Sequence, residues 1–277
     1  MRCCQKYMAL FCHSGRIMPV SFCHRRKTMI PGLVSVSFRK LLPEEVADLC
    51  VKAGFSAIEW GGDIHVPAGN LQRAMAVKAV SAARGMKIAA YGSYYHLGGS
   101  RDDFLRNLDT AAELGAPTMR IWAGSRGSAL VSAEERKQLV EEFSLDIFLA
   151  QEAGITLVPE FHGNTLTDTA ESLSQLMKEL PELRYYWQPR WDWSEDKCLA
   201  SLDMISEKLV SMHVFSWRIE NGKEIRLPLA AGEILWKKAF ARGKKDTCAL
   251  MEFVRDDDPE VFLADAETLK RWLDETA

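Results

Sequence analysis

Segments of strand length alternate with segments of helical pattern from Pro31 to the C-terminus of this 277-residue chain. Gly54, Gly85, Gly115 and Gly154 each follow a helical segment and mark its end. The predicted strands are Leu33–Ser37, Ala57–Trp60, Lys87–Tyr91, Thr118–Trp122, Ile155–Phe161, Arg184–Gln188, Leu209–Phe215 and Thr247–Val254. The predicted helices are Pro43–Ala53, Leu71–Arg84, Asp102–Leu114, Ala133–Ala153, Asp168–Leu180, Glu195–Lys208, Gly232–Arg242 and Pro259–Thr276. Such alternation implies parallel strands joined by right-handed crossovers.

Eight strand–helix units in roughly 250 residues match the size of a closed (β/α)8 barrel. The rival architecture is an open doubly wound sheet, which usually carries a glycine-rich phosphate loop after its first strand. The corresponding segment here is Ser35-Val36-Ser37-Phe38-Arg39, which contains no glycine. We therefore predict an α/β fold in which residues 29–277 form a single (β/α)8 TIM barrel. The dipeptide Asn221-Gly222 adds a predicted hairpin turn after the seventh strand.

Residues 1–28 differ in composition from the rest of the chain. They contain six basic residues, no acidic residue, and four of the seven cysteines. The longest apolar piece, Met8–Cys12, is too short for the core of a signal peptide. We interpret the segment as a basic, Cys-rich N-terminal extension and expect it to be disordered. An organelle transit segment and an upstream extension of the reading frame are both open, and the second is favoured.

Charge and cysteine placement restrict the partners of the chain. The formal net charge is −3, so no global basic field would attract nucleic acid. No apolar run approaches the roughly 18 residues of a membrane span. Cys50, Cys198 and Cys248 are scattered without the spacing of a disulfide framework, which is typical of reduced thiols. We expect a cytoplasmic protein with a small-molecule substrate and no nucleic-acid or membrane partner. The oligomeric state is open, and a homo-oligomer is possible.

Four short apolar runs in the second half of the chain each end in a residue that can bind a metal. These residues are Glu160, Gln188, His213 and Glu252, at the ends of predicted strands five to eight. Because the C-terminal ends of barrel strands share one face, the four side chains could converge there. A buried carboxylate is costly without a partner, and a divalent cation would compensate two at once. The pattern therefore predicts a metal site.

Each of these residues also has a simpler interpretation. A strand glutamate is often the salt-bridge partner of an arginine, here Arg120 or Arg190, and a histidine is often a hydrogen-bonded core residue. The common position at four successive strand ends favours the metal. Mixed oxygen and nitrogen ligands suit Mn²⁺, Mg²⁺, Co²⁺ or Zn²⁺. A structural zinc site is disfavoured because no thiol belongs to the set.

The chain from about Met29 onward resembles the xylose-isomerase-like family of sugar isomerases and epimerases. The segments that carry the resemblance are Gly54-Phe55-Ser56-Ala57-Ile58-Glu59-Trp60, Leu114-Gly115-Ala116, Glu160-Phe161-His162, Trp187-Gln188-Pro189, His213-Val214-Phe215 and Glu252-Phe253-Val254. In that family a divalent ion is held by Glu, Asp, His and Glu on strands five to eight. Glu160, His213 and Glu252 match this pattern, whereas Gln188 replaces the aspartate with an uncharged amide. Asp192, four residues later, is a second candidate for that ligand.

The resemblance implies an isomerase or epimerase that abstracts a proton next to a sugar carbonyl and passes through an enediol. Glu160 and Glu252 would be the base and the acid on opposite sides of the substrate. An inosose-dehydratase-like lyase is an alternative, because the same enolisation can lead to loss of water. A catalytically silent sugar-binding barrel is another, motivated by Gln188. The endonuclease branch of the superfamily needs more histidine and acidic ligands than this chain, with its six histidines, provides.

Aromatic and polar residues near other strand ends are candidates for the sugar pocket, which commonly combines an aromatic wall with a few polar groups. Packing within the barrel mouth is the alternative for each. The predicted substrate-binding residues are Glu59, His65, Tyr91, Trp122, His162 and Trp187.

Overall fold

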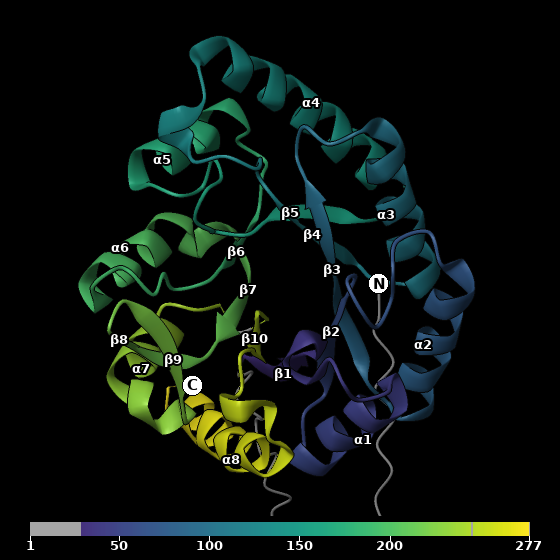
Figure 1. The fold of residues 1–277 in the computed structure, drawn as a ribbon, viewed down its shortest axis with the longest axis vertical. Helices are drawn as coiled ribbons and strands as arrows, with labels where there is room; N and C mark the ends of the chain where they lie inside the picture. The colour runs from purple at the N-terminus through teal and green to yellow at the C-terminus, as the bar shows by residue number, and fades with distance from the viewer. Residues whose placement is uncertain (1–28, 245, 277) are drawn as a thin grey trace, which may run out of the picture.

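The computed structural model describes residues 29–244 and 246–276, and within them eight parallel strands form a nearly closed barrel (Figure 1). The strands are β1 (Ile30–Val34), β2 (Ala57–Gly61), β3 (Lys87–His96), β4 (Thr118–Trp122), β5 (Thr156–Pro159), β6 (Tyr185–Trp187), β7 (Leu209–Val214) and β10 (Cys248–Met251). Their order in the sheet is β5-β4-β3-β2-β1-β10-β7-β6. Between β5 and β6 the described residues form a single parallel bridge, Glu160 to Tyr186. The predicted (β/α)8 architecture is confirmed.

Eight α-helices surround the strands in Figure 1, one after each barrel strand. Among the described residues they are α1 (Pro43–Ala53), α2 (Leu71–Ala83), α3 (Arg101–Leu114), α4 (Ala133–Glu152), α5 (Ala170–Glu179), α6 (Glu195–Ile205), α7 (Glu233–Phe240) and α8 (Pro259–Glu275). Local sequence signals set several ends. Ser132 and Glu135 form a reciprocal capping box at the start of α4, and Gly115 ends α3 in the left-handed conformation.

The core has two apolar layers, because strand side chains alternate between the inside of the barrel and the helices. A small inner cluster fills the lower part of the barrel and includes Val34, Ala90, Val158, Tyr186 and Leu250. A larger cluster lies between the sheet and the helices. Polar inward-facing residues follow the inner cluster toward the C-terminal ends of the strands. The apolar layer thus supports a polar site from below.

The predicted position of the first strand was wrong by three residues. We predicted Leu33–Ser37, but β1 spans Ile30–Val34, and residues 35–38 form a short 3-10 helix. Strand β1 pairs with β10 from Ile30 to Leu33 and with β2 from Gly32 to Val34. The pairing with these two neighbours, rather than the local β-rich pattern, determines where the strand begins and ends. The predicted extension, residues 1–28, lies outside the described residues.

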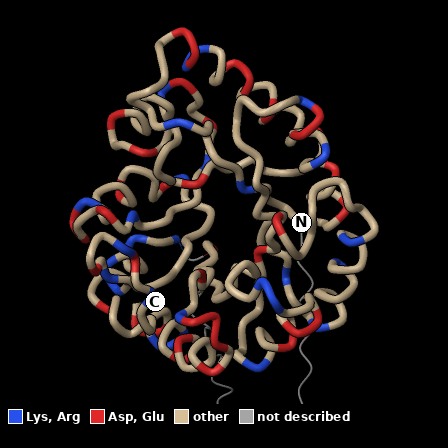
Figure 2. Tube along the Cα trace, in the orientation of Figure 1, with Lys and Arg blue, Asp and Glu red and all other residues tan. Residues whose placement is uncertain are grey.

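The outer surface carries charges of both signs. In the view of Figure 2, Lys and Arg are interspersed with Asp and Glu over the helices, and no broad area of one sign is seen. No helix within residues 29–244 and 246–276 is long and apolar enough to cross a membrane. The predicted absence of a nucleic-acid partner stays a prediction.

The predicted Asn221-Gly222 turn forms, and it joins β8 (Ser216–Glu220) to β9 (Lys223–Leu227) in an antiparallel hairpin. Arg226 of this hairpin holds the loop that follows β10. Its guanidinium lies 5.1 Å from the ring centre of Phe253, and Nη1 lies 2.8 Å from Asp257 Oδ1. Phe253 has a φ of 49°, a conformation that a bulky side chain adopts only under constraint from its surroundings. Arg226 supplies part of that constraint.

Substitution Arg226→Ala should destabilise the protein by about 1 kcal/mol, because it removes a cation–π contact and a partly exposed ion pair. Hydrogen exchange at residues 252–258 should accelerate. Equilibrium urea unfolding and exchange mass spectrometry measure the two effects. Arg218→Ala on the same hairpin is the control, since it removes only an exposed pair with Glu220. Equal effects from the two substitutions would contradict a specific role for Arg226.

Candidate metal centre

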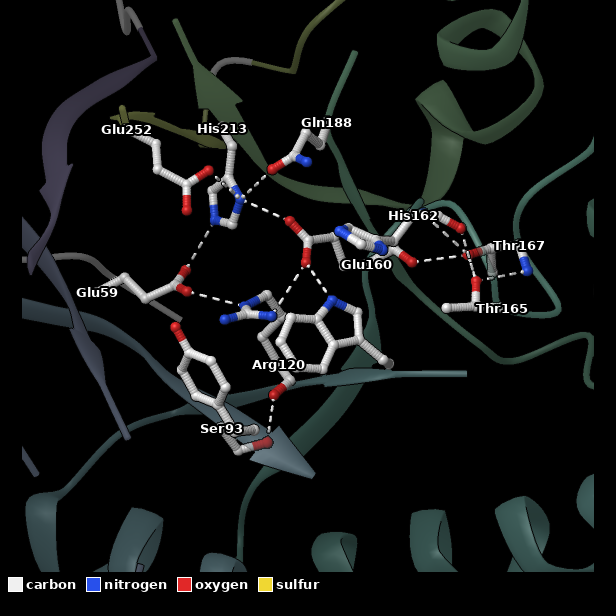
Figure 3. A network of polar contacts seen from close by, with 12 residues as sticks. Glu59, Ser93, Arg120, Glu160, His162, Thr165, Thr167, Gln188, His213 and Glu252 are labelled. Atoms are coloured by element: carbon white, nitrogen blue, oxygen red, sulfur yellow. Dashed lines mark hydrogen bonds and ion pairs between the residues drawn. The ribbon is translucent and has the colours of Figure 1, made fainter. Parts of the chain in front are cut away.

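The four strand-end residues predicted as ligands meet at the C-terminal face of the barrel (Figure 3). One ligand atom from each of Glu160, His213 and Glu252 lies within 4.8 Å of the others. His213 Nδ1 is 2.8 Å from Glu160 Oε1 and 3.3 Å from Glu252 Oε2. Gln188 Oε1 lies 3.3 Å from the same imidazole nitrogen. The residues come from β7 and from the positions directly after β5, β6 and β10.

An arginine that the sequence analysis treated only as an alternative partner of Glu160 lies at the centre of this site. Arg120 Nε donates to Glu59 Oε1 and Nη1 donates to Glu160 Oε2, each at 3.0 Å. All three side chains are buried, with 4% or less exposed. The salt-bridge interpretation of Glu160 and its place in a metal-capable cluster are therefore both realised, one through each carboxylate oxygen.

Glu59 orients His213 from below. His213 Nε2 lies 3.2 Å from Glu59 Oε2, as expected when the nitrogen donates its proton to the carboxylate. The other nitrogen, Nδ1, faces Glu160, Gln188 and Glu252. The carboxylates favour the protonated imidazole, so Nδ1 would bind a cation after giving up its proton. Gly92 makes room for Glu59, because a Cβ at this position would lie 2.5 Å from Glu59 Oε1. Glu59 thus belongs to the support of the site.

The second oxygen of Glu160 is held by two donors. Trp122 Nε1 donates to Oε2 at 2.8 Å, and Arg120 Nη1 donates to the same atom. The loop after β5 fixes the backbone, since Thr167 Oγ1 donates to the Glu160 carbonyl at 2.7 Å and accepts from His162 N at 3.2 Å (Figure 3). Glu160 therefore has one oxygen, Oε1, that faces the ligand cluster.

The two carboxylates of the cluster differ in acidity. Burial raises the pKa of Glu160, but Arg120 and His213 outweigh burial and hold this pKa well below its usual range. For Glu252 burial prevails and raises the pKa to about 7, although His213 opposes the shift. Burial lowers the pKa of His213, but Glu252, Glu59 and Glu160 together raise it well above its usual value. Glu160 is thus a fixed anion, and Glu252 can hold or release a proton near neutral pH.

An aromatic wall borders the site on the side of β3 to β5. The Trp122 ring lies 5.5 Å from that of His162, 4.7 Å from that of His96 and 5.2 Å from that of Tyr94, between centroids. His96 Nδ1 is 3.0 Å from Gly124 O and His162 Nδ1 is 2.8 Å from Gly163 O, so each ring is fixed by a backbone carbonyl. The sequence analysis did not single out His96.

The structure does not bring all predicted substrate-binding residues to the cluster. Glu59, Trp122 and His162 lie at or beside it. His65 is buried between Ser35 Oγ and the Leu41 carbonyl, at 3.0 and 3.1 Å. The other two face the helical layer, where Tyr91 Oη donates to the Val66 carbonyl and Trp187 Nε1 donates to Ser201 Oγ. Because their polar atoms are occupied there, neither points to the centre that Glu160 and His213 define.

Asp192 does not replace Gln188 in the cluster. Its carboxylate accepts two hydrogen bonds from Arg190, at 2.9 and 2.7 Å, on a partly exposed loop. Gln188 is the group beside His213. The site therefore offers two carboxylate oxygens, one imidazole nitrogen and one amide oxygen. This set of hard and intermediate donors fits Mg²⁺, Mn²⁺ or Co²⁺, and the oriented His213 tautomer fits a ligand role.

Comparison with known proteins agrees with this fold. Residues 47–272 match the family described as xylose isomerase-like TIM barrel. The chain belongs to this family. No curated protein sequence matches the chain. Solved structures of the family architecture superimpose on most of it, and all those described next share less than 25% of its sequence, so they show the fold alone.

Three of these solved structures show how differently the proteins with this fold are described. The probable 3-DHS dehydratase AsbF of Bacillus anthracis, involved in petrobactin synthesis, has a TM-score of 0.69 at 19% identity, with 87% of this chain and 99% of that chain covered. D-psicose 3-epimerase of Clostridium cellulolyticum H10 has 0.64 at 12%, covering 90% and 99%. A xylose isomerase-like TIM barrel protein of Mycobacterium smegmatis in complex with magnesium has 0.63 at 14%, covering 90% and 97%.

Arg120 is the site residue that sequence reasoning missed most clearly. The signal was an arginine inside the apolar strand Thr118–Trp122, where a charged side chain needs a buried partner. Its partner Glu59 had been assigned to substrate binding. The sequence could not show that the two side chains meet, because they are 61 positions apart and on strands that are not adjacent in the sheet.

Substitution Arg120→Met should destabilise the protein by about 3–5 kcal/mol, because it leaves Glu59 and Glu160 buried without their common counter-ion. Equilibrium urea unfolding measures the loss. The double variant Arg120→Met with Glu59→Gln should recover part of it, since one of the orphaned charges is removed. A loss below about 1 kcal/mol for the single variant would show that the pairs contribute little.

Proposed function

We propose that this barrel is a divalent-metal-dependent enzyme that moves a proton next to the carbonyl of a small sugar or sugar derivative. The observation that carries the proposal is the buried Glu160–His213–Glu252 cluster, aligned with Gln188 and supported from below by Arg120 and Glu59. A bound cation would supply Lewis acidity that polarises a substrate carbonyl and acidifies the neighbouring C–H group. Membership of the xylose isomerase-like family supports the same class of chemistry.

Glu160 and Glu252 have different roles in the proposed reaction. Glu160 Oε2 accepts from both Arg120 and Trp122, which favours the anion and leaves this carboxylate as a fixed ligand. Among the described residues neither an arginine nor a tryptophan donates to Glu252, whose pKa burial raises to about 7. Glu252 is accordingly the proposed base that takes the substrate proton and returns it. His162 and Trp122 border the space where the rest of a sugar would lie.

This inequality bears on the type of reaction. Epimerisation with protons moved on opposite faces of the substrate needs a second group that delivers a proton on the other face. One proton carrier suits an aldose–ketose isomerisation, in which the proton returns to the adjacent carbon on the same face. It also suits a dehydration that starts from the same enolate, the second candidate. The fold similarity to a probable 3-DHS dehydratase is compatible with that candidate but does not favour it over the first.

Addition of Mn²⁺ or Co²⁺ to chelator-treated protein should raise its melting temperature. Binding at 100 times the dissociation constant adds about 2.7 kcal/mol of stability, which corresponds to several degrees for a chain of this size. Differential scanning calorimetry and metal analysis of the purified protein measure the effect. His213→Ala should abolish the increase. A wild-type protein that neither retains nor responds to a divalent metal would refute the proposed enzyme.

Glu252→Gln should abolish exchange of the substrate α-hydrogen with deuterium, because the amide cannot accept the proton. The test uses a panel of ketoses and ketose phosphates in D₂O with excess Mn²⁺, followed by proton NMR. Exchange without net conversion would still identify the proton-abstraction step. The melting temperature of the variant checks that the fold is intact. If the variant retains exchange at the wild-type rate, Glu252 is not the base.

A further inference from the structure

Gln188 is the one member of the cluster whose two polar ends have opposite character. The amide carbonyl accepts hydrogen bonds or binds cations, and the amide NH₂ group donates. With the carbonyl directed to the cluster, Oε1 lies 3.3 Å from His213 Nδ1. Figure 3 shows this side chain beside His213, on the same side as Glu160. In the position of Gln188 the usual family ligand, an aspartate, would present oxygen atoms alone.

In the protein without an ion, the better orientation of the amide is the one with its NH₂ group turned to the cluster, because both polar ends then find partners. Nε2 then donates to Glu160 Oε1 and to Glu252 Oε2, at 3.0 Å each. These two oxygens belong to the carboxylates that form the ligand cluster with His213. The exchange needs rotation only about the last side-chain torsion, whose energy profile is broad and nearly two-fold. No backbone movement is required.

We propose that Gln188 exchanges the two ends of its amide when the centre takes up a divalent cation. Without an ion, the NH₂ group links Glu160 to Glu252 and offsets part of the repulsion between two buried carboxylates. With an ion, the carbonyl oxygen turns toward it as a neutral ligand. The inference rests on the metal-binding part of the proposed function. It goes further because it makes Gln188 a device for reversible, comparatively weak metal binding.

The physical reason lies in charge. A third carboxylate in place of the amide would attract a cation more strongly but would be unable to donate to Glu160 or Glu252. The metal-free protein would then hold three mutually repelling anions that Arg120 and His213 compensate incompletely. Compared with a carboxylate, the amide brings the metal-free and metal-bound proteins closer in stability. Its NH₂ group stabilises the metal-free protein by donating to Glu160 and Glu252, and its carbonyl attracts a bound cation less strongly because it carries no charge.

The first test is Gln188→Glu, which keeps the length and shape of the side chain and replaces its NH₂ group by an anionic oxygen. At pH 8 the metal-free melting temperature should fall by a few degrees, whereas the Mn²⁺ dissociation constant should decrease roughly tenfold or more. Calorimetry with chelator and Mn²⁺ titration followed by electron paramagnetic resonance measure the two quantities. If Gln188 had a merely structural role, its substitution by Glu would lower both the melting temperature and the affinity for Mn²⁺. Gln188→Leu, which has neither the carbonyl nor the NH₂ group, should lower both.

The control for charge is Gln72→Asp, which adds the same charge at an exposed position in the first turn of α2. The Mn²⁺ dissociation constant should stay at its wild-type value, and the metal-free melting temperature should not fall, because an acidic residue in the first turn of a helix is favourable. If Gln188→Glu binds Mn²⁺ no more tightly than the wild type, or if its metal-free form is no less stable, the exchange is refuted.

The second test observes the amide directly. The side-chain ¹⁵N–¹H resonances of Gln188 can be assigned by their disappearance in Gln188→Glu. Addition of the diamagnetic ion Mg²⁺ should shift them and accelerate their exchange with solvent, because the NH₂ group loses two carboxylate partners. Unchanged resonances in a protein that binds Mg²⁺ would overturn this inference alone. A wild-type protein that binds neither Mg²⁺ nor Mn²⁺ would overturn the proposed function as well.

Discussion

The guanidinium of Arg120 lies between Glu59 of β2 and Glu160 after β5, and the arrangement of the whole centre depends on it. Two glutamates buried at the same level of a barrel would repel each other and take up protons. His213 and Arg120 together keep both ionised, and Arg120 fixes one oxygen of each. The remaining oxygen of Glu59 orients His213, and that of Glu160 faces the ligand cluster. Arg120 therefore fixes the two carboxylates that contact the two ring nitrogens of His213.

This dependence explains why the carboxylates of the centre are chemically different although their residue types are identical. Glu160 accepts from the arginine and from an indole N–H, whereas Glu252 lies 3.3 Å from His213 Nδ1 and, among the described residues, accepts from neither of those two donors. A symmetrical pair would suit a symmetrical reaction. Under the proposed function, Glu160 would hold the cation and Glu252 would transfer the proton. Substrate specificity would then be set by the aromatic wall around Trp122 rather than by the carboxylates.

Most of the fold followed from local sequence patterns. Helix ends were marked by Pro43, Gly54 and Gly115, and alternating strands and helices left one closed architecture of the right size. The ligand positions Glu160, Gln188, His213 and Glu252 could be grouped because strand ends share a face. The register of β1 could not be predicted, since it is set by pairing with β10 across more than 200 residues.

Tyr91 and Trp187 are predicted site residues that lie away from the cluster for one common reason. Whether a strand residue points into the barrel or toward the helices is decided by a single step in register. Glu59 points inward, and its neighbour Trp60 bonds Ser81 in the helical layer. Tyr91 and Trp187 likewise face helices. A local pattern rich in apolar residues on both faces, as in these strands, gives no alternation from which that direction could be read.

The weakest pairing in the barrel lies where its chemistry is expected. Strands β5 and β6 are joined, within the described residues, by the bridge between Glu160 and Tyr186 alone. Glu160 ends one side of this seam and Gln188 follows the other. Any group that held both residues would cross-link the two edges of the sheet and complete the cylinder. In the proposed metal-free state the Gln188 NH₂ group already links to Glu160 across this seam. A bound cation would replace that hydrogen bond by coordination of both residues, so the rigidity of the seam would differ between the two states.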